Sequence, residues 1–188
     1  MVEKYDSIIQ NCVWDVVPRS EDKSMVSSGW LYKVKQAADG SVEKHKARFV
    51  ARSFSHVEGI NYNETFSLVA RYSSIRSMLA LSAQMGWKIH QMDVKTVFLN
   101  GKIKEEVYIE QLESFETFDH ELHVCQLKRD LYGLKQAPRA WYTKIDSYFT
   151  GLGFTKSEVD VNLYHIMVEG KPMIIVLYVD DLILTGDD

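Results

Sequence analysis

Two adjacent carboxylates near the end of the chain are the residues best suited to chemistry. Asp180 and Asp181 follow the apolar run 173–179 and precede the apolar residues 182–184. Such a run predicts a central, largely buried strand, so these acids emerge at the end of a rigid core element. A third acid, Asp93, ends a strand predicted over 87–94. If the two strands are sheet neighbours, the three carboxylates converge on one edge of the sheet.

Three carboxylates a few ångströms apart repel one another by about 4 kcal/mol per pair at an effective dielectric constant of 20. Divalent cations bound between the carboxylates replace this repulsion with attraction. Oxygen ligands without histidine or thiolate favour Mg²⁺ or Mn²⁺. A two-metal site of this kind supports in-line phosphoryl displacement. The acids alone therefore predict metal-assisted phosphoryl transfer by a polymerase, a nuclease or a phosphohydrolase, although an aspartate pair also occurs in purely structural turns.

The pattern of apolar and turn-forming residues predicts the elements that position these acids. Strands are expected over 30–34 and 47–50, joined by the turn 38–41, and over 162–168, 172–179 and 182–184. One helix is expected from Ser73 or Ser74 to Gly86, with an apolar stripe of Ile75, Met78, Leu79 and Met85. A second opens at Pro138. The order of elements predicts an α+β fold with a predominantly antiparallel sheet.

Composition excludes several classes of protein. The 188 residues are 46% hydrophobic and 26% charged, which is typical of a globular protein rather than of a disordered or collagen-like chain. The net charge of −4 conceals an acidic stretch over 105–121, which lies between basic stretches over 23–56 and 128–144. These stretches suit a protein that meets polyanions on one surface, or they are ordinary solvated faces. Two distant cysteines and short apolar runs indicate reduced thiols and no membrane association.

Longer strings identify a family. Residues 178–181 resemble the YVDD box of reverse transcriptases, and four further blocks resemble, in order, those of copia-type retrotransposon reverse transcriptases: 46–52, 59–67, 90–101 and 131–142. The resemblance spans nearly the whole chain. It implies a right-hand polymerase fold with an N-terminal arm (1–25), fingers (26–86 and 100–133) and palm (87–99 and 134–188), the thumb being absent.

The resemblance also implies roles for individual residues. Asp93, Asp180 and Asp181 match the catalytic carboxylates that hold two Mg²⁺ or Mn²⁺ ions. Five residues match positions that bind the nucleotide: Lys46, Arg48, Phe98, Tyr132 and Gly133. Tyr178 matches a position that contacts the primer. Phe98 and Tyr132 have an alternative as packing residues, and Lys46 and Arg48 have one as exposed charges of a hairpin.

The implied partners are an RNA or DNA template with its primer and deoxynucleoside triphosphates. The family continues beyond a point equivalent to Asp188 through a thumb and a ribonuclease H domain, and its polyproteins include an integrase. The resemblance therefore predicts a fragment or relic of a polyprotein, cytoplasmic (in a virus-like particle) or nuclear and not secreted, with weak or no activity alone. A non-catalytic nucleic-acid-binding remnant of the same fold is the main alternative, followed by a metal-dependent nuclease or phosphatase.

Overall fold

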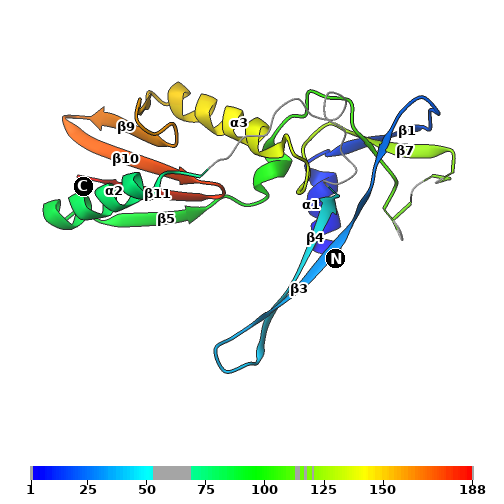
Figure 1. Cartoon of the computed structure of the whole chain (residues 1–188), viewed down its shortest axis with the longest axis horizontal. Coiled ribbons are helices and arrows are strands. Elements are labelled where there is room, and N and C mark those ends of the chain that lie inside the picture. Colours follow the sequence, from blue (N-terminus) through cyan, green and yellow to red (C-terminus); the bar gives the residue numbers. More distant parts are fainter. Residues whose placement is uncertain (1, 53–68, 113–114, 117, 120, 188) are drawn as a thin grey trace. The chain divides into compact units, whose positions relative to one another are not determined.

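The computed structural model describes residues 2–52, 69–112, 115–116, 118–119 and 121–187 (Figure 1). The chain divides into two compact units. Unit 1 comprises Met1–Thr65 and Phe98–Ala140, and unit 2 comprises Phe66–Val97 and Trp141–Asp188. Helices and strands are mixed throughout, which confirms the α+β prediction. The family-like block at 59–67 lies outside the described residues.

Unit 2 is built on a five-stranded sheet in the order β5-β11-β10-β9-β8, with every neighbouring pair antiparallel. The strand bounds are β5 Ile89–Asp93, β8 Thr155–Lys156, β9 Leu163–Val168, β10 Lys171–Tyr178 and β11 Asp181–Gly186. Strand β10 lies in the middle of this sheet, and its residues 175–177 are buried. The prediction of a central, buried strand before the two aspartates is confirmed.

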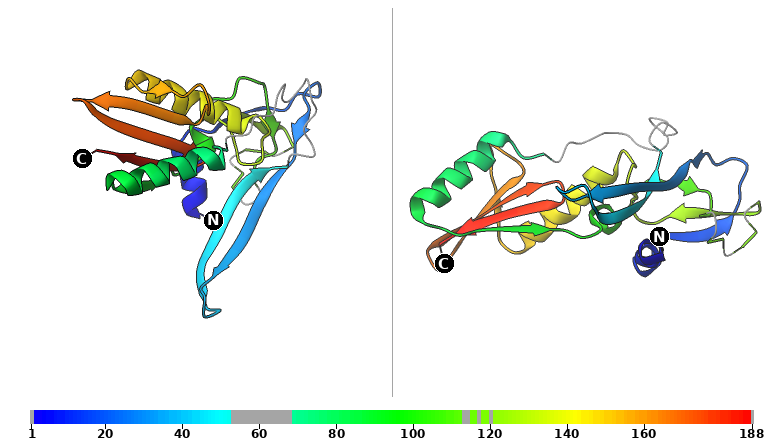
Figure 2. Two further views of the ribbon diagram at one scale, coloured as in Figure 1. Left: turned by 60° about the vertical axis from the view of Figure 1, so that its left-hand side comes forward. Right: turned by 90° about the horizontal axis from the view of Figure 1, so that it is seen from below.

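Two helices cover opposite faces of this sheet (Figure 2). Helix α2 (Tyr72–Met85) packs Met78 into a cluster with Val176 of β10. Helix α3 (Ala137–Gly151) places Phe149 against Tyr164 of β9, with ring centroids 5.0 Å apart. Val176 and Tyr164 point to opposite faces because Tyr164 pairs with the residue that precedes Val176. The sheet edge carrying the aspartates is thus supported by packing from both sides.

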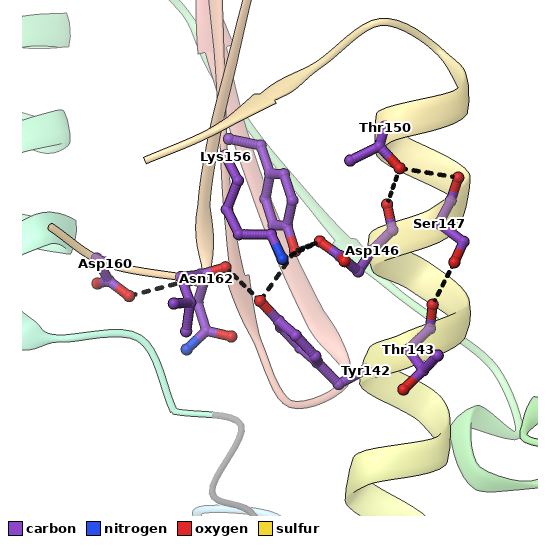
Figure 3. Close-up of polar contacts among 10 residues, drawn as sticks. Tyr142, Thr143, Asp146, Ser147, Thr150, Lys156, Asp160 and Asn162 are labelled. Carbon is purple, nitrogen blue, oxygen red and sulfur yellow. Dashed lines mark hydrogen bonds and ion pairs between the residues drawn. The ribbon is translucent and has the colours of Figure 1, made fainter. Parts of the chain in front are cut away.

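A polar network ties α3 to the segment that leads into β9 (Figure 3). Asp146 forms an ion pair with Lys156 at 2.6 Å and accepts a hydrogen bond from the Tyr164 hydroxyl at 2.8 Å. The Tyr142 hydroxyl donates to the carbonyl of Val161 at 2.7 Å. These contacts fix the rotation of α3 on the sheet.

The start of α2 differs from the prediction that Ser73 or Ser74 caps it. Arg71 occupies the N-cap position without a side-chain capping bond. The carboxylate of the buried Asp160 accepts hydrogen bonds from the Arg71 N–H at 2.9 Å and from the Ser74 hydroxyl at 2.6 Å. These bonds offset burial and lower the pKa of Asp160. A residue 86 positions away in sequence therefore satisfies this helix end.

Unit 1 contains a four-stranded sheet in the order β1-β7-β6-β2, in which only the β2–β6 pair is parallel. Its strands are β1 Trp14–Pro18, β2 Met25–Val26, β6 Tyr108–Ile109 and β7 His123–Leu127, accompanied by α1 (Val2–Gln10) and a 3₁₀ turn, η2 (Val97–Asn100). Its main core includes Val26, Ile109, Cys125 and Leu131. Both cysteines are free thiols, and burial raises the pKa of Cys125 to about 12.

The predicted hairpin is confirmed as β3 (Ser28–Gln36) paired with β4 (Val42–Ala51). Near its base Trp30 lies opposite Phe49, and their rings pack at 5.4 Å. At its tip the side chain of Asp39 accepts hydrogen bonds from the Ser41 N–H and hydroxyl, which lower the pKa of Asp39. The hairpin extends well beyond the rest of unit 1 (Figure 1).

The two compact units do not test the assignment of fingers and palm. Residues 69–86, expected in the fingers, belong to the unit of the five-stranded sheet, and residues 134–140, expected in the palm, belong to the other unit. The assignment of fingers and palm remains a prediction. None of the helices in the described part of the chain is both long and apolar enough to cross a membrane.

Candidate functional site

The strand register brings two of the three predicted catalytic acids together. Strands β5 and β11 are antiparallel neighbours, and Asp93 lies directly opposite Asp181. Directly opposed residues of such a pair have Cα atoms about 4.5–5.5 Å apart and side chains on the same face. Strand β5 is therefore a neighbour of β11 and not of β10, the apolar strand before the aspartates, and both carboxylates project from one end of the sheet.

Asp180 lies beside this pair in the tight turn between β10 and β11. Tyr178 pairs with Asp181, so Val179 and Asp180 form the two central residues of the turn. The backbone carbonyl of Asp180 accepts a hydrogen bond from the N–H of Val94 at 2.8 Å. This bond joins the turn to the residue that follows Asp93, so the three acids lie on adjoining backbone positions of unit 2.

Two side chains contact the residues that flank the turn. The Gln91 amide donates to Asp181 Oδ1 at 3.1 Å. Tyr178 shares a hydrogen bond with the Tyr72 hydroxyl, which raises the pKa of Tyr178. Gln91 lies two residues before Asp93 and therefore shares its face of β5. Both contacts orient residues of the candidate site from within the same unit.

The three carboxylates offer oxygen donors, which suit a hard cation such as Mg²⁺ or Mn²⁺. Asp93 is exposed, and Asp180 and Asp181 are half-buried, so all three are accessible. Within the described residues, however, no group of three or more His, Cys, Asp or Glu side chains is arranged to hold a metal ion. The backbone places the three acids on adjoining positions, and their role as metal ligands stays a prediction.

The predicted nucleotide-binding residues gather within unit 1. The rings of Phe98 and Tyr132 meet edge to face with centroids 5.0 Å apart. The guanidinium carbon of Arg48 lies 5.4 Å from the centroid of the Tyr132 ring, within range of a cation–π contact. Lys46 lies two residues before Arg48 on β4 and so shares its face. The structure thus joins Phe98, Tyr132 and Arg48, with Lys46 further along the same strand.

Gly133 holds this group against the end of β4. Its φ is +90°, and a Cβ atom at this position would lie 2.0 Å from the carbonyl oxygen of Ala51. The N–H of Ala51 in turn donates to the Tyr132 carbonyl at 2.8 Å. Only glycine permits this approach of the two backbones. Phe98 also serves packing, since it lies against the core of unit 1.

Sequence reasoning did not assign a site role to three residues that contact the candidate turn or its flanking residues: Gln91, Tyr72 and Trp141. The indole Nε1 of Trp141 donates to the Val179 carbonyl at 2.9 Å. Strand alternation places Gln91 on the face of Asp93, so the sequence carries a local signal for this residue. The contacts of Tyr72 and Trp141 depend on tertiary packing and have no local signal.

Comparison with known proteins finds one matching family and several similar polyproteins. Residues 11–188 match the family described as reverse transcriptase (RNA-dependent DNA polymerase). The chain is 38% identical over its full length to the Retrovirus-related Pol polyprotein from transposon RE1 of Arabidopsis thaliana and to that from transposon TNT 1-94 of Nicotiana tabacum. It is 31% identical over 89% of its length to the Transposon Ty1-LR2 Gag-Pol polyprotein of Saccharomyces cerevisiae. It spans 13%, 14% and 9% of these proteins, respectively.

Proposed function

Because this chain belongs to the copia-type branch of the reverse transcriptase (RNA-dependent DNA polymerase) family, we propose that it is the polymerase portion of a retrotransposon Pol polyprotein. Its reaction is the addition of deoxynucleotides from their triphosphates to a primer on an RNA or DNA template. The single observation that carries this proposal is the pairing of Asp93 with Asp181 beside the turn that holds Asp180.

Asp93, Asp180 and Asp181 are the residues proposed to hold two Mg²⁺ or Mn²⁺ ions. Such ions, when bound, activate the primer hydroxyl and stabilise charge on the transferring phosphoryl group. Carboxylate oxygens at an accessible end of the sheet suit the binding of these ions. Tyr178 is proposed to contact the primer. Lys46 and Arg48 are proposed to bind the triphosphate by charge, and Gly133 and Tyr132 to line the nucleotide pocket.

Phe98 is proposed to select deoxyribose, because a rigid ring beside the sugar excludes a 2′-hydroxyl. Its edge-to-face contact with Tyr132 supports this role by limiting the rotation of both rings. Unit 1 is proposed to correspond mainly to the fingers and unit 2 to the palm. The remaining polyprotein domains, including thumb, ribonuclease H and integrase, are proposed partners, and the site of action is a cytoplasmic virus-like particle or the nucleus.

Primer extension on a poly(A) template with an oligo(dT) primer tests this proposal. The chain should incorporate dTTP only with Mg²⁺ or Mn²⁺. Asp180→Asn should lower the rate about 100-fold or more, since metal-held charge stabilisation contributes several kcal/mol and each 1.4 kcal/mol is tenfold. Asp187→Asn, which removes an exposed carboxylate beyond β11, is the matched control and should retain activity. Equal rates for Asp180→Asn and the parent chain would refute the catalytic role.

A non-catalytic nucleic-acid-binding protein is the second candidate, favoured by one specific observation. Lys33 lies opposite Lys46 and Lys35 opposite Lys44 on the β3–β4 hairpin, so like charges face each other. Like charges directly opposite each other are destabilising, and a bound polyanion would offset that repulsion. This candidate predicts salt-dependent binding of an RNA–DNA hybrid without extension, and equal binding by Asp180→Asn.

A further inference from the structure

The turn between β10 and β11 holds Val179 in an unusual backbone conformation. Its φ is +59°, in the left-handed region that favours glycine. A β-branched residue is a genuine outlier there. A residue keeps such a strained conformation only where contacts with the surrounding structure hold it there. The neighbours of this turn should therefore include a group that fixes it.

Trp141 supplies that group from α3. Its side chain is 3% exposed, and its indole N–H donates to the Val179 carbonyl at 2.9 Å. The indole has one donor and no acceptor, so this carbonyl satisfies its hydrogen-bonding capacity. Residues 142 and 146 of the same helix are tied to the segment around β8 and β9, so the indole is presented from an anchored support.

The atom that Trp141 binds determines the direction of Asp180. The Val179 carbonyl belongs to the planar peptide unit that runs from the Cα of Val179 to the Cα of Asp180. Fixing that plane limits ψ of Val179 and φ of Asp180, and so limits the direction in which the Asp180 side chain leaves the backbone. The next carbonyl along, that of Asp180, is held by the Val94 N–H at 2.8 Å. Two consecutive carbonyls are thus held by different elements of unit 2.

We propose that Trp141 is a positioning residue whose indole N–H holds the strained Val179–Asp180 peptide, and with it the Asp180 carboxylate, beside Asp93. The consequence for metal use rests on the proposed function of these carboxylates. The hold on the turn itself does not rest on that function. The competing explanation is that Trp141 only fills space in the core beneath the turn.

Trp141→Phe separates the two explanations, because it removes the N–H and keeps an aromatic ring. Trp87→Phe is the matched control, since Trp87 is a half-buried tryptophan of the same unit. Amide hydrogen exchange at Val94 reports the turn directly, because that amide binds the Asp180 carbonyl. Trp141→Phe should speed exchange at Val94 about fivefold or more, the change expected for one lost hydrogen bond. In Trp141→Phe the amides of β9 should exchange as in the parent chain. In Trp87→Phe the Val94 amide should exchange as in the parent chain.

A second variant keeps the test informative if Trp141→Phe loses stability. Glycine adopts positive φ without strain, so Val179→Gly added to Trp141→Phe should recover part of the Val94 protection. A pure packing defect at Trp141 would gain nothing from that change. Unaltered exchange at Val94 in Trp141→Phe, or equal acceleration across all strands of unit 2 without recovery by Val179→Gly, would overturn the proposal.

Primer extension supplies the readout for metal use. Trp141→Phe should raise the Mg²⁺ concentration at half-maximal rate about fivefold or more, with an unchanged KM for dTTP, whereas Trp87→Phe should match the parent chain. Altered exchange at Val94 without extension by the parent chain would refute polymerase activity of this chain on its own and leave the contact of Trp141 with the turn standing. Extension with the same Mg²⁺ dependence in both variants would refute the positioning role.

Discussion

Gly133 shows how one residue without a side chain sets the position of the predicted nucleotide-binding group. Replacing it with alanine places a Cβ atom 2.0 Å from the Ala51 carbonyl oxygen at a φ of +90°. We expect Gly133→Ala to lower the free energy of unfolding by about 2–4 kcal/mol, through overpacking and backbone strain together. Urea denaturation measures this loss.

Gly40 provides the control for that substitution. Its φ is +83°, and a Cβ atom there would meet nothing within 4 Å. Gly40→Ala therefore carries the backbone strain without the clash and should cost about 1 kcal/mol. Equal losses for the two variants would show that the approach of Gly133 to Ala51 is unimportant.

The buried Asp130 should make the folding stability of the chain depend on pH. Its side chain is fully buried and neither carboxylate oxygen has a hydrogen-bond partner in the described structure. Burial, with a smaller contribution from Glu105, raises the pKa of Asp130 to about 7. Between about pH 4 and 7 the folded chain keeps a proton that the unfolded chain has released, so stability falls as pH rises through this window.

The size of this effect is at most about 4 kcal/mol, at 1.36 kcal/mol per pKa unit. Asp130→Asn should remove the slope and make the chain more stable than the parent above pH 7. Urea denaturation at pH 5, 6, 7 and 8 measures both slopes. Parallel stability profiles for the two chains would contradict the assigned burial of a protonated carboxyl.

At the scale of elements, the β3–β4 hairpin combines weak intrinsic stability with concentrated charge. Its outer part is exposed, and two lysine pairs face each other across the strands. Lys44→Glu replaces the repulsion with Lys35 by attraction, which should stabilise the hairpin by about 0.2–1 kcal/mol. The same change should weaken binding of an RNA–DNA hybrid and lower the slope of log affinity against log salt by about one.

A gain in stability together with a loss of affinity for the RNA–DNA hybrid would distinguish a binding surface from an ordinary solvated face. Lys104→Glu changes the net charge equally in the same unit but outside the hairpin, and it serves as the control. Fluorescence anisotropy over a range of salt concentrations measures binding, and thermal unfolding measures stability. Equal binding by Lys44→Glu and Lys104→Glu would remove the hairpin from the nucleic-acid surface.

The elements most visible in the sequence are those with strong local signals. The apolar run before Asp180 predicts β10, and the turn residues 38–41 predict the hairpin. The stripe on α2 was predicted only in part, because Met78 is buried whereas Leu79 and Met85 are exposed. Ser82 is buried instead and contacts the Thr185 hydroxyl at 2.9 Å. A polar pair between helix and sheet leaves no apolar signal.

At the scale of the whole molecule, sequence order conceals the division into units, because the chain crosses between them three times. Asp93 and Asp181 could be assigned together from the sequence because each stands at the end of a strand. Their direct opposition, and the contact of Trp141 with Val179, depend on register and packing that no local pattern encodes. Similarity to Pol polyproteins supplied the family, and the structure supplied the arrangement around the acids.

Asp93 and Asp180 are proposed to hold the same divalent cations. Mn²⁺ binding, followed by electron paramagnetic resonance, tests it on the full chain assembled with an RNA template, a dideoxy-terminated primer and dTTP. Asp93→Asn and Asp180→Asn should each weaken Mn²⁺ binding by about tenfold or more, whereas Asp187→Asn should bind as the parent chain does. Unchanged Mn²⁺ affinity in Asp93→Asn would contradict the account.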